Sequence, residues 1–379
     1  MKALTPCYMR VGGTSADYMA FNETSQDHIL KVSDWDQLNR LTREAGWDLI
    51  FGLNLRMRKN GHWDPKNALK LFQYTIKKGY HVAGWELGNE PEYHHPEKFT
   101  EENIAYNFGR LRTILDSIPQ LKPYVLVGPD VTHVQPLSPY YMDAKKAEIT
   151  DFYDVAKLDE FKTKWIAPAM SIARNRGVPL WLGETSSAYG GGVVDMSDRY
   201  VAGYMWLDKL GVAASLGVKI VLRQDLIAGN YALLDGNYHP FPDYWLTVLY
   251  KRLVGSPVLT PPTSNNKNVR IYAHCTNTHS SHSYRRGSVT IYMMNFMNTQ
   301  VMINLGPFSN KPADVYILTP GPLNGLKSST VKLNGKELLL LNDLDLPPLS
   351  PQQHTGDIQV GRKAMAFIVV PDANHQACL

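Results

Sequence analysis

The pattern of apolar and polar positions changes character near residue 254. Between about residues 48 and 250, short apolar runs alternate with longer segments in which apolar residues recur every three or four positions. The short runs predict buried strands and the longer segments predict amphipathic helices. This alternation is typical of parallel strands joined by crossover helices, either in a barrel or in an open doubly wound sheet.

Local signals support several of the predicted helix starts. Asp64 followed by Pro65, and Thr100 followed by two glutamates, are typical of the first turn of a helix. Pro168 is expected to interrupt its helix, because proline cannot donate a backbone hydrogen bond. The predicted strands are 48–54, 81–87, 124–130, 179–185 and 218–224, and the predicted helices are 64–80, 100–118, 158–175 and 197–217.

After residue 254, short β-rich runs are separated by glycine, asparagine and proline. The segment from Lys332 to Leu338, with Asn334 and Gly335 at its centre, predicts a hairpin. We therefore expect an antiparallel β-sandwich over residues 255–379, appended to an α/β domain over residues 1–254.

Composition narrows the class of protein only slightly. The 379 residues are 44% hydrophobic and 20% charged, with a net charge of +4, as in ordinary soluble proteins with a slightly basic surface. This charge is compatible with a polyanionic ligand but does not argue for nucleic acid. No segment is long enough to span a membrane, and the first residues lack the apolar core of a signal peptide. No spacing of His and Cys indicates a metal site or another cofactor.

Two glutamates lie where the predicted strands 81–87 and 179–185 end, in the strings "WELGNEP" and "LWLGETSSAYGGG". These are Glu90 and Glu184. Catalytic residues of (β/α)8 enzymes come from this end of the strands, and two facing carboxyl groups are what glycoside hydrolysis requires. A lone glutamate at a strand end is more often a capping or salt-bridge residue. The full string "WELGNEP" favours the catalytic interpretation instead, because the Asn89 amide beside Glu90 can hydrogen-bond a sugar 2-hydroxyl.

Longer strings carry a family resemblance. "WELGNEP", "WLGETSSAYGGG", "AGYMWLDKLG", "AGNY" and "PDYWLTVLYKRLVG" resemble heparanases, the retaining endo-β-glucuronidases that cut β-1,4 glucuronidic linkages in heparan sulfate. The similarity runs from "YMRVGGT" to the final "ACL", with gaps. It implies a (β/α)8 TIM-type barrel with a C-terminal antiparallel β-sandwich.

The resemblance also implies roles for individual residues. Glu90 would be the proton donor, Glu184 the nucleophile, and Asn89 the residue that holds the 2-hydroxyl of the glucuronate. No cofactor is implied, and the partner would be heparan sulfate or heparin, with membranes reached only through proteoglycans. Further residues would line the subsites or face sulfate: Thr14, Gln135, Tyr140, Lys145, Gly190, Gly191, Gln224 and Tyr231.

Cysteines and a glycosylation sequon bear on the compartment. Cys275 and Cys378 fall where the family bridges its sandwich, and such a bridge suits an oxidising environment. Cys7 is then left over. Asn22 begins an Asn-Glu-Thr sequon, which matters only for a secreted chain. The resemblance implies a secreted, matrix or lysosomal protein.

The chain also departs from the family pattern. The segment that would supply the first barrel strand, which the family carries as a separate small chain, does not precede "YMRVGGT", and the family's linker is also missing. Only residues 132–139 join "GPDV" to "YYM", where the family has a helix and a strand, and Ser138-Pro139 replaces a histidine next to the nucleophile. We therefore expect an incomplete barrel in a shortened form, with a small N-terminal chain as a candidate partner.

Three functions remain open from sequence. The first is endo-cleavage of heparan sulfate. The second is a catalytically inactive isoform or relative that binds heparan sulfate without cutting it. The third is an exo-acting β-glucuronidase, which would differ from the first in the length of its products.

Overall fold

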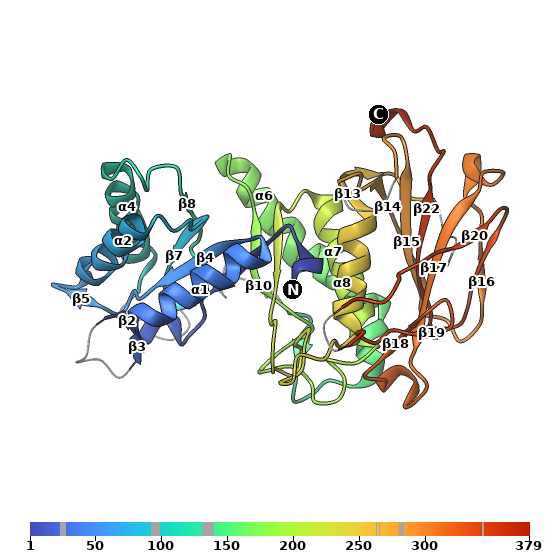
Figure 1. The fold of residues 1–379 in the computed structure, drawn as a ribbon, viewed down its shortest axis with the longest axis horizontal. Coiled ribbons are helices and arrows are strands. Elements are labelled where there is room, and N and C mark those ends of the chain that lie inside the picture. The colour runs from blue at the N-terminus through green and yellow to red at the C-terminus, as the bar shows by residue number, and fades with distance from the viewer. Residues whose placement is uncertain are drawn as a thin grey trace. The chain divides into compact units, whose positions relative to one another are not determined.

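The computed structural model describes residues 1–22, 28–91, 99–130, 140–262, 264, 266–279, 284–342 and 345–379. The chain divides into two compact units, Met1–Ser138 and Pro139–Leu379 (Figure 1).

The first unit is built on a four-stranded parallel sheet with the order β1-β4-β7-β8 (Figure 1). Crossover helices join successive strands, as the alternating pattern predicts. The strands are β1 (Cys7–Val11), β4 (Trp47–Leu53), β7 (Gly84–Leu87) and β8 (Val125–Leu126), and the helices are α1 (Val32–Ala45), α2 (Lys66–Lys78) and α4 (Glu101–Ser117).

Short elements complete the first unit. The Thr100 side chain accepts the Asn103 N–H, which confirms the predicted start of α4. The start of α2 differs slightly, because Pro65 is its N-cap and the Asp64 side chain accepts the Lys66 N–H instead. The short elements are η1 (Lys2–Leu4), η2 (Ala16–Tyr18), the parallel pair β2 (Met19–Phe21) and β3 (His28–Leu30), and the antiparallel pair β5 (Arg58–Lys59) and β6 (His62–Trp63).

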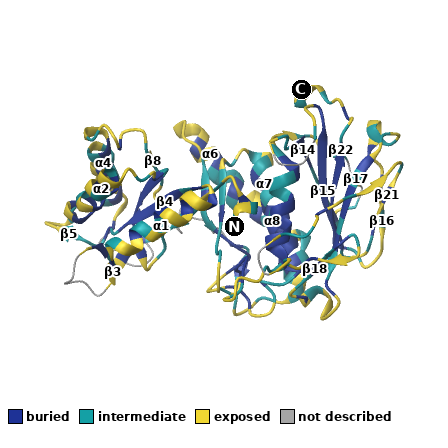
Figure 2. Cartoon of the chain, viewed as in Figure 1, coloured by how far each residue is buried: buried dark blue, intermediate teal, exposed yellow. Residues whose placement is uncertain are grey.

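Aromatic side chains fill the core between this sheet and its helices. Trp85 of β7 meets Phe72 of α2 edge-on at 4.7 Å between ring centroids, and Trp35 of α1 meets Phe51 of β4 at 4.8 Å. Strands β4 and β7 are almost wholly buried, as Figure 2 shows in dark blue. Burial of this kind, at about 25 cal/mol for each Å² of apolar surface, holds the strand ends in fixed positions.

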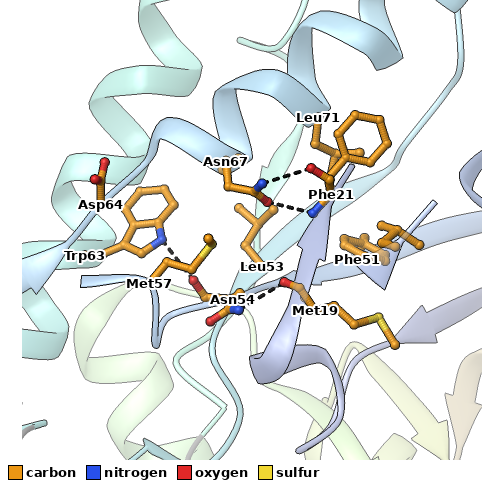
Figure 3. Close-up of a pocket in the computed structure, with 13 residues that line it drawn as sticks. Met19, Phe21, Phe51, Leu53, Asn54, Met57, Trp63, Asp64, Asn67 and Leu71 are labelled. Carbon is orange, nitrogen blue, oxygen red and sulfur yellow. Dashed lines mark hydrogen bonds between the residues drawn. The ribbon is translucent and has the colours of Figure 1, made fainter. Parts of the chain in front are cut away.

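Side-chain amides hold the segment around β2 onto the rest of the first unit (Figure 3). Asn67 accepts the Phe21 N–H at 2.8 Å and donates to the Phe21 carbonyl at 3.0 Å, so it replaces a strand partner. Asn54 donates to the Met19 carbonyl and its own carbonyl accepts the Trp63 indole N–H. The cavity between these groups is about 20 Å³, which is room for a single water rather than for a sugar.

The second unit begins with an α/β part. Strands β10 (Trp181–Thr185) and β12 (Ile220–Arg223) pair in parallel, and β9 (Met142–Asp143) pairs in parallel with β11 (Ala188–Tyr189). The helical elements are η3 (Ile149–Tyr153), α5 (Val155–Glu160), the π-helix η4 (Phe161–Ile166), α6 (Ala167–Arg176), α7 (Ala202–Leu216) and α8 (Pro242–Leu253).

The predicted interruption at Pro168 takes another form. The chain is continuously helical from α5 through η4 to α6, and Pro168 lies in the first turn of α6. Proline lacks the N–H that an α-helical turn would use, and the preceding turn widens to a π-helix instead of breaking. The helix also begins earlier than predicted, because Asp154 caps it by accepting the Ala156 N–H.

An eight-stranded antiparallel sheet forms the C-terminal part (Figure 1). A two-stranded layer, β16 with β21, covers one face of it, and the shared apolar core includes Ile291, Val315, Ile303 and Ile358. The strands are β13 (Val254–Leu259), β14 (Val269–Thr276), β15 (Val289–Asn295), β16 (Val301–Ile303), β17 (Ala313–Pro320), β18 (Val331–Leu333), β19 (Lys336–Glu337), β20 (Gln352–His354), β21 (Ile358–Val360) and β22 (Met365–Val370), with short helices η5 (Gly306–Phe308), η6 (Gly325–Lys327) and η7 (Gln376–Cys378).

The opposite face of the large sheet packs on helices α7 and α8. Tyr292 of β15 stacks between Tyr272 and Phe367 at 5.3 and 5.6 Å, and Tyr250 of α8 meets it edge-on at 5.6 Å. A Cβ at Gly211 of α7 would lie 2.4 Å from the Tyr272 ring, so only glycine permits this approach. The sheet is therefore covered on both sides.

Two sequence predictions for this part are confirmed. The hairpin between β18 and β19 turns at Asn334 and Gly335, both with positive φ, as a two-residue turn of this kind requires. Cys275 and Cys378 form a disulfide that ties the end of the chain to β14. The third cysteine, Cys7, lies in β1.

The domain boundary stays a prediction. Helix α8 ends at Leu253 and the first strand of the large sheet begins at Val254, which is where the residue pattern changes. The two compact units of the structure instead meet in the sequence between Ser138 and Pro139. In the described residues, the sheets that contain β1 and β10 hold six parallel strands, fewer than the eight of a complete (β/α)8 barrel.

Candidate active site

Glu90 lies in a tight turn directly after β7. Gly88 and Glu90 both have positive φ, at 77° and 45°. Glutamate rarely adopts this conformation, and such residues persist only where their surroundings fix them, often at active sites. The Glu90 N–H donates to the Asp130 carbonyl at 3.0 Å, and the Asn89 N–H donates to Asp17 Oδ2 at 3.2 Å. Two backbone donors therefore hold the turn.

Arg10 of β1 fixes the side chains around this turn. Its Nε donates to Glu86 at 2.7 Å, and its Nη2 donates to Asn89 Oδ1 at 3.1 Å and to Asp130 Oδ2 at 2.5 Å. The guanidinium is only 8% exposed, so these contacts are little screened by water. With Asn89 Oδ1 occupied by Arg10, the amide NH₂ of Asn89 is oriented as a donor for a ligand oxygen.

Space around Arg10 depends on a glycine. A Cβ at Gly12 would lie 2.9 Å from the guanidinium carbon. No role was predicted for Arg10 from sequence, although it lies in the quoted string "YMRVGGT". The available signal was a charged residue inside an otherwise apolar strand, which requires a buried partner.

Asp17 is a buried carboxyl group beneath the same turn. Its Oδ2 accepts the Asn89 N–H, while Oδ1 is buried without a hydrogen-bond partner among the described residues. Burial raises the pKa of Asp17 to about 7, against the opposing effects of the Asn89 N–H, Arg56 and Arg10. The carboxyl is therefore protonated under mildly acidic conditions and ionises near neutrality.

Asp17 should make the protein less stable as the pH rises from about 4 to 7. Its folded-state pKa lies above the unfolded value, so the folded state holds the proton more tightly and its stabilising effect is complete below about pH 4. We expect the wild type to lose on the order of 3 kcal/mol across this window relative to Asp17→Asn. Denaturant unfolding of both proteins at several pH values measures this difference, with the exposed Asp116→Asn as control. If the free energies of unfolding of wild type and Asp17→Asn change equally with pH, Asp17 does not cause the loss of stability.

Glu184 lies near the end of β10 in the second unit, and its carboxylate is held by Tyr140. The Tyr140 hydroxyl donates to Glu184 Oε1 at 2.8 Å and also lies in hydrogen-bond contact with Gln224 Oε1. One hydroxyl proton serves one acceptor at a time, so the three side chains form a small shared network. The structure thus brings together three of the predicted site residues: Tyr140, Glu184 and Gln224.

Tyr231 follows β12 in a loop that Arg223 holds in place. Arg223 donates to the Tyr231 carbonyl from Nε at 3.2 Å and from Nη2 at 2.8 Å, and it pairs with buried Asp243 at 2.8 Å. Burial, reinforced by the negative charge of Glu184, raises the pKa of Tyr231 to about 12. The Tyr231 phenol therefore stays protonated and can act as a hydrogen-bond donor.

The glycine run after β11 exposes backbone rather than side chains. Gly190 and Gly191 are exposed with φ of 85° and 95°. Lys145 is exposed and follows β9, the strand that pairs with β11. The next glycine, Gly192, is required for another reason, because a Cβ there would lie 2.6 Å from the Tyr231 ring. The run therefore offers an open surface next to a cation.

The remaining predicted residues lie at the surface or outside the described residues. Thr14 is exposed after β1. Asn22 is exposed at the end of β2, with its N–H donated to the Leu30 carbonyl. Gln135 lies outside the described residues.

The described residues offer no alternative centre. Within those ranges, no group of three or more His, Cys, Asp or Glu side chains is arranged to hold a metal ion. The larger described cleft, about 760 Å³, lies between α5 and the end of β15, and neither Glu184 nor its partners line it. The two glutamate clusters remain the candidate chemistry.

Comparison with known proteins identifies the family. The profile described as "Glycosyl hydrolase family 79, N-terminal domain" matches residues 24–135. A hyaluronoglucuronidase of Hirudo nipponia is 36% identical, with 100% of this chain and 89% of that protein covered. The chain belongs to glycosyl hydrolase family 79. It is therefore a glycosidase.

Two further relatives and one solved structure are similar to this chain. A heparanase of Gallus gallus is 32% identical over 99% of this chain and 87% of its own length. A protein named inactive heparanase-2 of Homo sapiens is 31% identical over 94% of this chain and 67% of its own length. The structure of a 4-O-α-L-rhamnosyl-β-D-glucuronidase from Fusarium oxysporum superposes with a TM-score of 0.70 at 14% identity, covering 96% of this chain and 88% of that one.

These findings confirm the predicted fold class for this family 79 chain. It has the mixed α/β architecture of the TIM-barrel glycosidases, followed by an antiparallel C-terminal sheet. The resemblance to heparanases is likewise confirmed. Because the structural likeness is at low sequence identity, it supports the fold alone.

Replacing Tyr140 by phenylalanine should slow this family 79 glycosidase by about 10- to 100-fold in kcat, since a hydrogen bond to a charged group contributes roughly 1.5–3 kcal/mol. The hydroxyl is the group that orients the Glu184 carboxylate. Steady-state kinetics on an aryl β-glucuronide give the value. The matched control is Tyr204→Phe, which removes a hydroxyl bonded to the Lys363 carbonyl. Equal kcat values for both variants would contradict a role for Tyr140 at the site.

Proposed function

We propose that this chain is a retaining endo-β-glucuronidase that cleaves glucuronidic linkages in heparan sulfate, with Glu184 as nucleophile and Glu90 as proton donor. The hydrogen bond from Tyr140 to Glu184 Oε1 carries this proposal, because it fixes the direction of a carboxylate at the end of a parallel strand. The names of the relatives support glucuronate as the sugar and a glycosaminoglycan as the polymer.

The proposed reaction has two balanced steps. Glu184 attacks the anomeric carbon of glucuronate, the glycosidic C–O bond breaks, and Glu90 gives its proton to the leaving oxygen. Water then loses a proton to Glu90 and attacks the same carbon, which releases Glu184 as a carboxylate. In retaining enzymes the second carboxylate acts as the nucleophile in this way, and the first residue switches from acid to base.

Surrounding residues supply binding in this proposal. The Asn89 amide, oriented by Arg10, would donate to the sugar 2-hydroxyl, where hydrogen bonds strengthen in the transition state. Exposed Lys145 beside Gly190 and Gly191 would meet the negative charge of the polymer. Thr14, Gln135, Gln224 and Tyr231 would line further subsites.

The compartment follows as part of the same proposal. A disulfide between Cys275 and Cys378 persists most readily in oxidising surroundings, which suits a secreted or lysosomal protein. In the described ranges, helices are all too short or too polar to cross a bilayer. An acidic compartment would also keep Asp17 protonated beneath the Glu90 turn.

One observation favours a second candidate. A protein named inactive heparanase-2 is a close relative, so binding of heparan sulfate without cleavage is the competing function. The backbone N–H of Glu90 holds its turn and Tyr140 holds the Glu184 carboxylate, and these two contacts favour catalysis over binding alone.

The test is the product-length distribution from size-defined heparan sulfate and from hyaluronan at mildly acidic pH, with Glu184→Gln as control. Internal fragments from heparan sulfate with the wild type alone support endo-cleavage. Free glucuronate as the first product would show exo action instead. Fragments from hyaluronan alone would move the substrate to that polymer. Retained heparin affinity without fragments, in a protein that melts cooperatively, would establish the non-cleaving alternative.

A further inference from the structure

Helix α7 buries a lysine beside the strand that carries Glu184. Lys209 is 1% exposed, and its Nζ lies 4.6 Å from the centroid of the Tyr141 ring and 4.5 Å from that of Phe161. Its Nζ donates to the Ser186 carbonyl at 2.7 Å and to Thr185 Oγ1. A lysine is rarely buried to this extent, so a specific role is expected.

The contacts of Lys209 belong to a clamp on the chain that follows Glu184. Three successive carbonyls accept hydrogen bonds from three different places. That of Thr185 accepts the Gln224 N–H at 2.9 Å, that of Ser186 accepts Lys209 Nζ, and that of Ser187 accepts the Tyr141 N–H at 3.0 Å. Of these three donors, Lys209 is the one that comes from a side chain, and the one that comes from a helix.

Lys209 also reaches the segment that delivers Tyr140. The Tyr141 ring packs against Lys209 Nζ. Tyr141 follows Tyr140 in the chain and is the last residue before β9. Lys209 therefore contacts Tyr141 and Thr185, the residues that directly follow Tyr140 and Glu184 in the chain. Tyr140 and Glu184 are the two partners of the hydrogen bond described above.

We propose that Lys209 is a positioning residue that sets the Tyr140–Glu184 hydrogen bond by holding Thr185 and Ser186 against Tyr141. This inference rests on the proposed role of Glu184 as nucleophile. Burial, with the charge of Arg223, lowers the pKa of Lys209 well below its usual range. A neutral amine still has two N–H donors, enough for both acceptors, so the clamp does not depend on the charge.

The kinetic test compares Lys209→Met with Tyr140→Phe and with the double variant. We expect Lys209→Met to lower kcat by about 10- to 100-fold with KM changed less than about threefold, because small displacements of a reacting group are costly. In the Tyr140→Phe background the same change should cost about threefold or less, since the bond that it misplaces is already absent. Additive effects, or unchanged kcat in folded Lys209→Met, would overturn the proposal.

Two further measurements separate this inference from the proposed function. A glucuronyl fluoride fluorinated next to the anomeric carbon traps the ester on the nucleophile, and its labelling rate reports how well Glu184 is positioned for attack, without the need for a proton donor. The rate of backbone deuterium exchange across residues 181–193 reports how firmly the segment after Glu184 is held, and it does not depend on catalysis. We expect this rate to rise in Lys209→Met. The control is Lys219→Met, which makes the same change at an exposed position before β12. It should leave the labelling rate and the deuterium exchange rate unchanged.

The labelling rates of the wild type and of Lys209→Met distinguish failure of the proposed function from failure of this inference. A wild type that is not labelled refutes Glu184 as nucleophile and with it the positioning role of Lys209. A wild type and a Lys209→Met variant that are labelled equally fast refute Lys209 alone. If Lys209→Met does not fold, Thr185→Val, which removes only the Oγ1 acceptor, takes its place: about fivefold slower labelling is expected, and an unchanged rate overturns the proposal.

Discussion

Glu184→Gln is expected to abolish turnover, with kcat at least about 10⁴-fold below the wild type. The amide has the size of the carboxylate but cannot form the covalent ester on which a retaining reaction depends. Tyr140 can still donate to the amide oxygen, so folding and binding should survive. Initial rates on an aryl β-glucuronide and on heparan sulfate measure the loss, and the melting temperature checks the fold.

The control for this variant is Glu160→Gln, which makes the same change on partly exposed α5 next to Lys164. Its kcat should equal that of the wild type within about twofold, as for most surface changes. Residual turnover by Glu184→Gln above about one part in a thousand would assign the nucleophile elsewhere.

Glu90→Gln should give a loss that depends on the leaving group. Without a proton donor, cleavage of heparan sulfate should fall by about 10²- to 10⁴-fold, the usual contribution of general acid catalysis. An activated aryl glucuronide, whose phenolate leaves without a proton, should lose much less in the first step. The measurement is kcat/KM across a series of aryl glucuronides of different phenol pKa.

The slope of that series decides the role of Glu90. A steep dependence on phenol pKa in Glu90→Gln, with a shallow one in the wild type, is the expected result. Equal slopes would show that Glu90 does not protonate the leaving oxygen. Glu101→Gln, at an exposed position in the first turn of α4, is the matched control.

Much of the local structure could be predicted because its causes are local. The hairpin turn at Asn334 and Gly335, the Thr100 cap and the strand that ends before Glu90 each depend on residues within a few positions of one another. Such signals can be read from a short string of sequence. The same holds for the change of pattern at residue 254.

The partners of the site residues could not be predicted in this way. Arg10 meets Asp130 across 120 positions of the chain, and Tyr140 meets Glu184 across 44. No periodicity links such pairs; only the tertiary fold brings them together. Lys209 was hidden for another reason, because a lysine in an apolar helix suggests a side chain that reaches water.

Asp17 shows the same limit for electrostatics. Its sequence neighbours indicate nothing unusual, and its pKa of about 7 arises from burial beneath a turn more than 70 residues away in the chain, which donates its Asn89 N–H at a separation of 72. Burial of a single group depends on the whole tertiary structure. Sequence can name such a carboxylate but cannot say whether it is charged.

The large C-terminal sheet has a consequence for anyone who shortens this protein for expression. Its second face is lined by Tyr272, Tyr292 and Phe367, which meet α7 and α8, the helices that carry Lys209 and Asp243. A chain cut at residue 254 would leave these two helices with a bare apolar side, prone to aggregation. The sheet therefore supports the helices behind Glu184, and substitutions beneath it should reduce activity as readily as they reduce solubility.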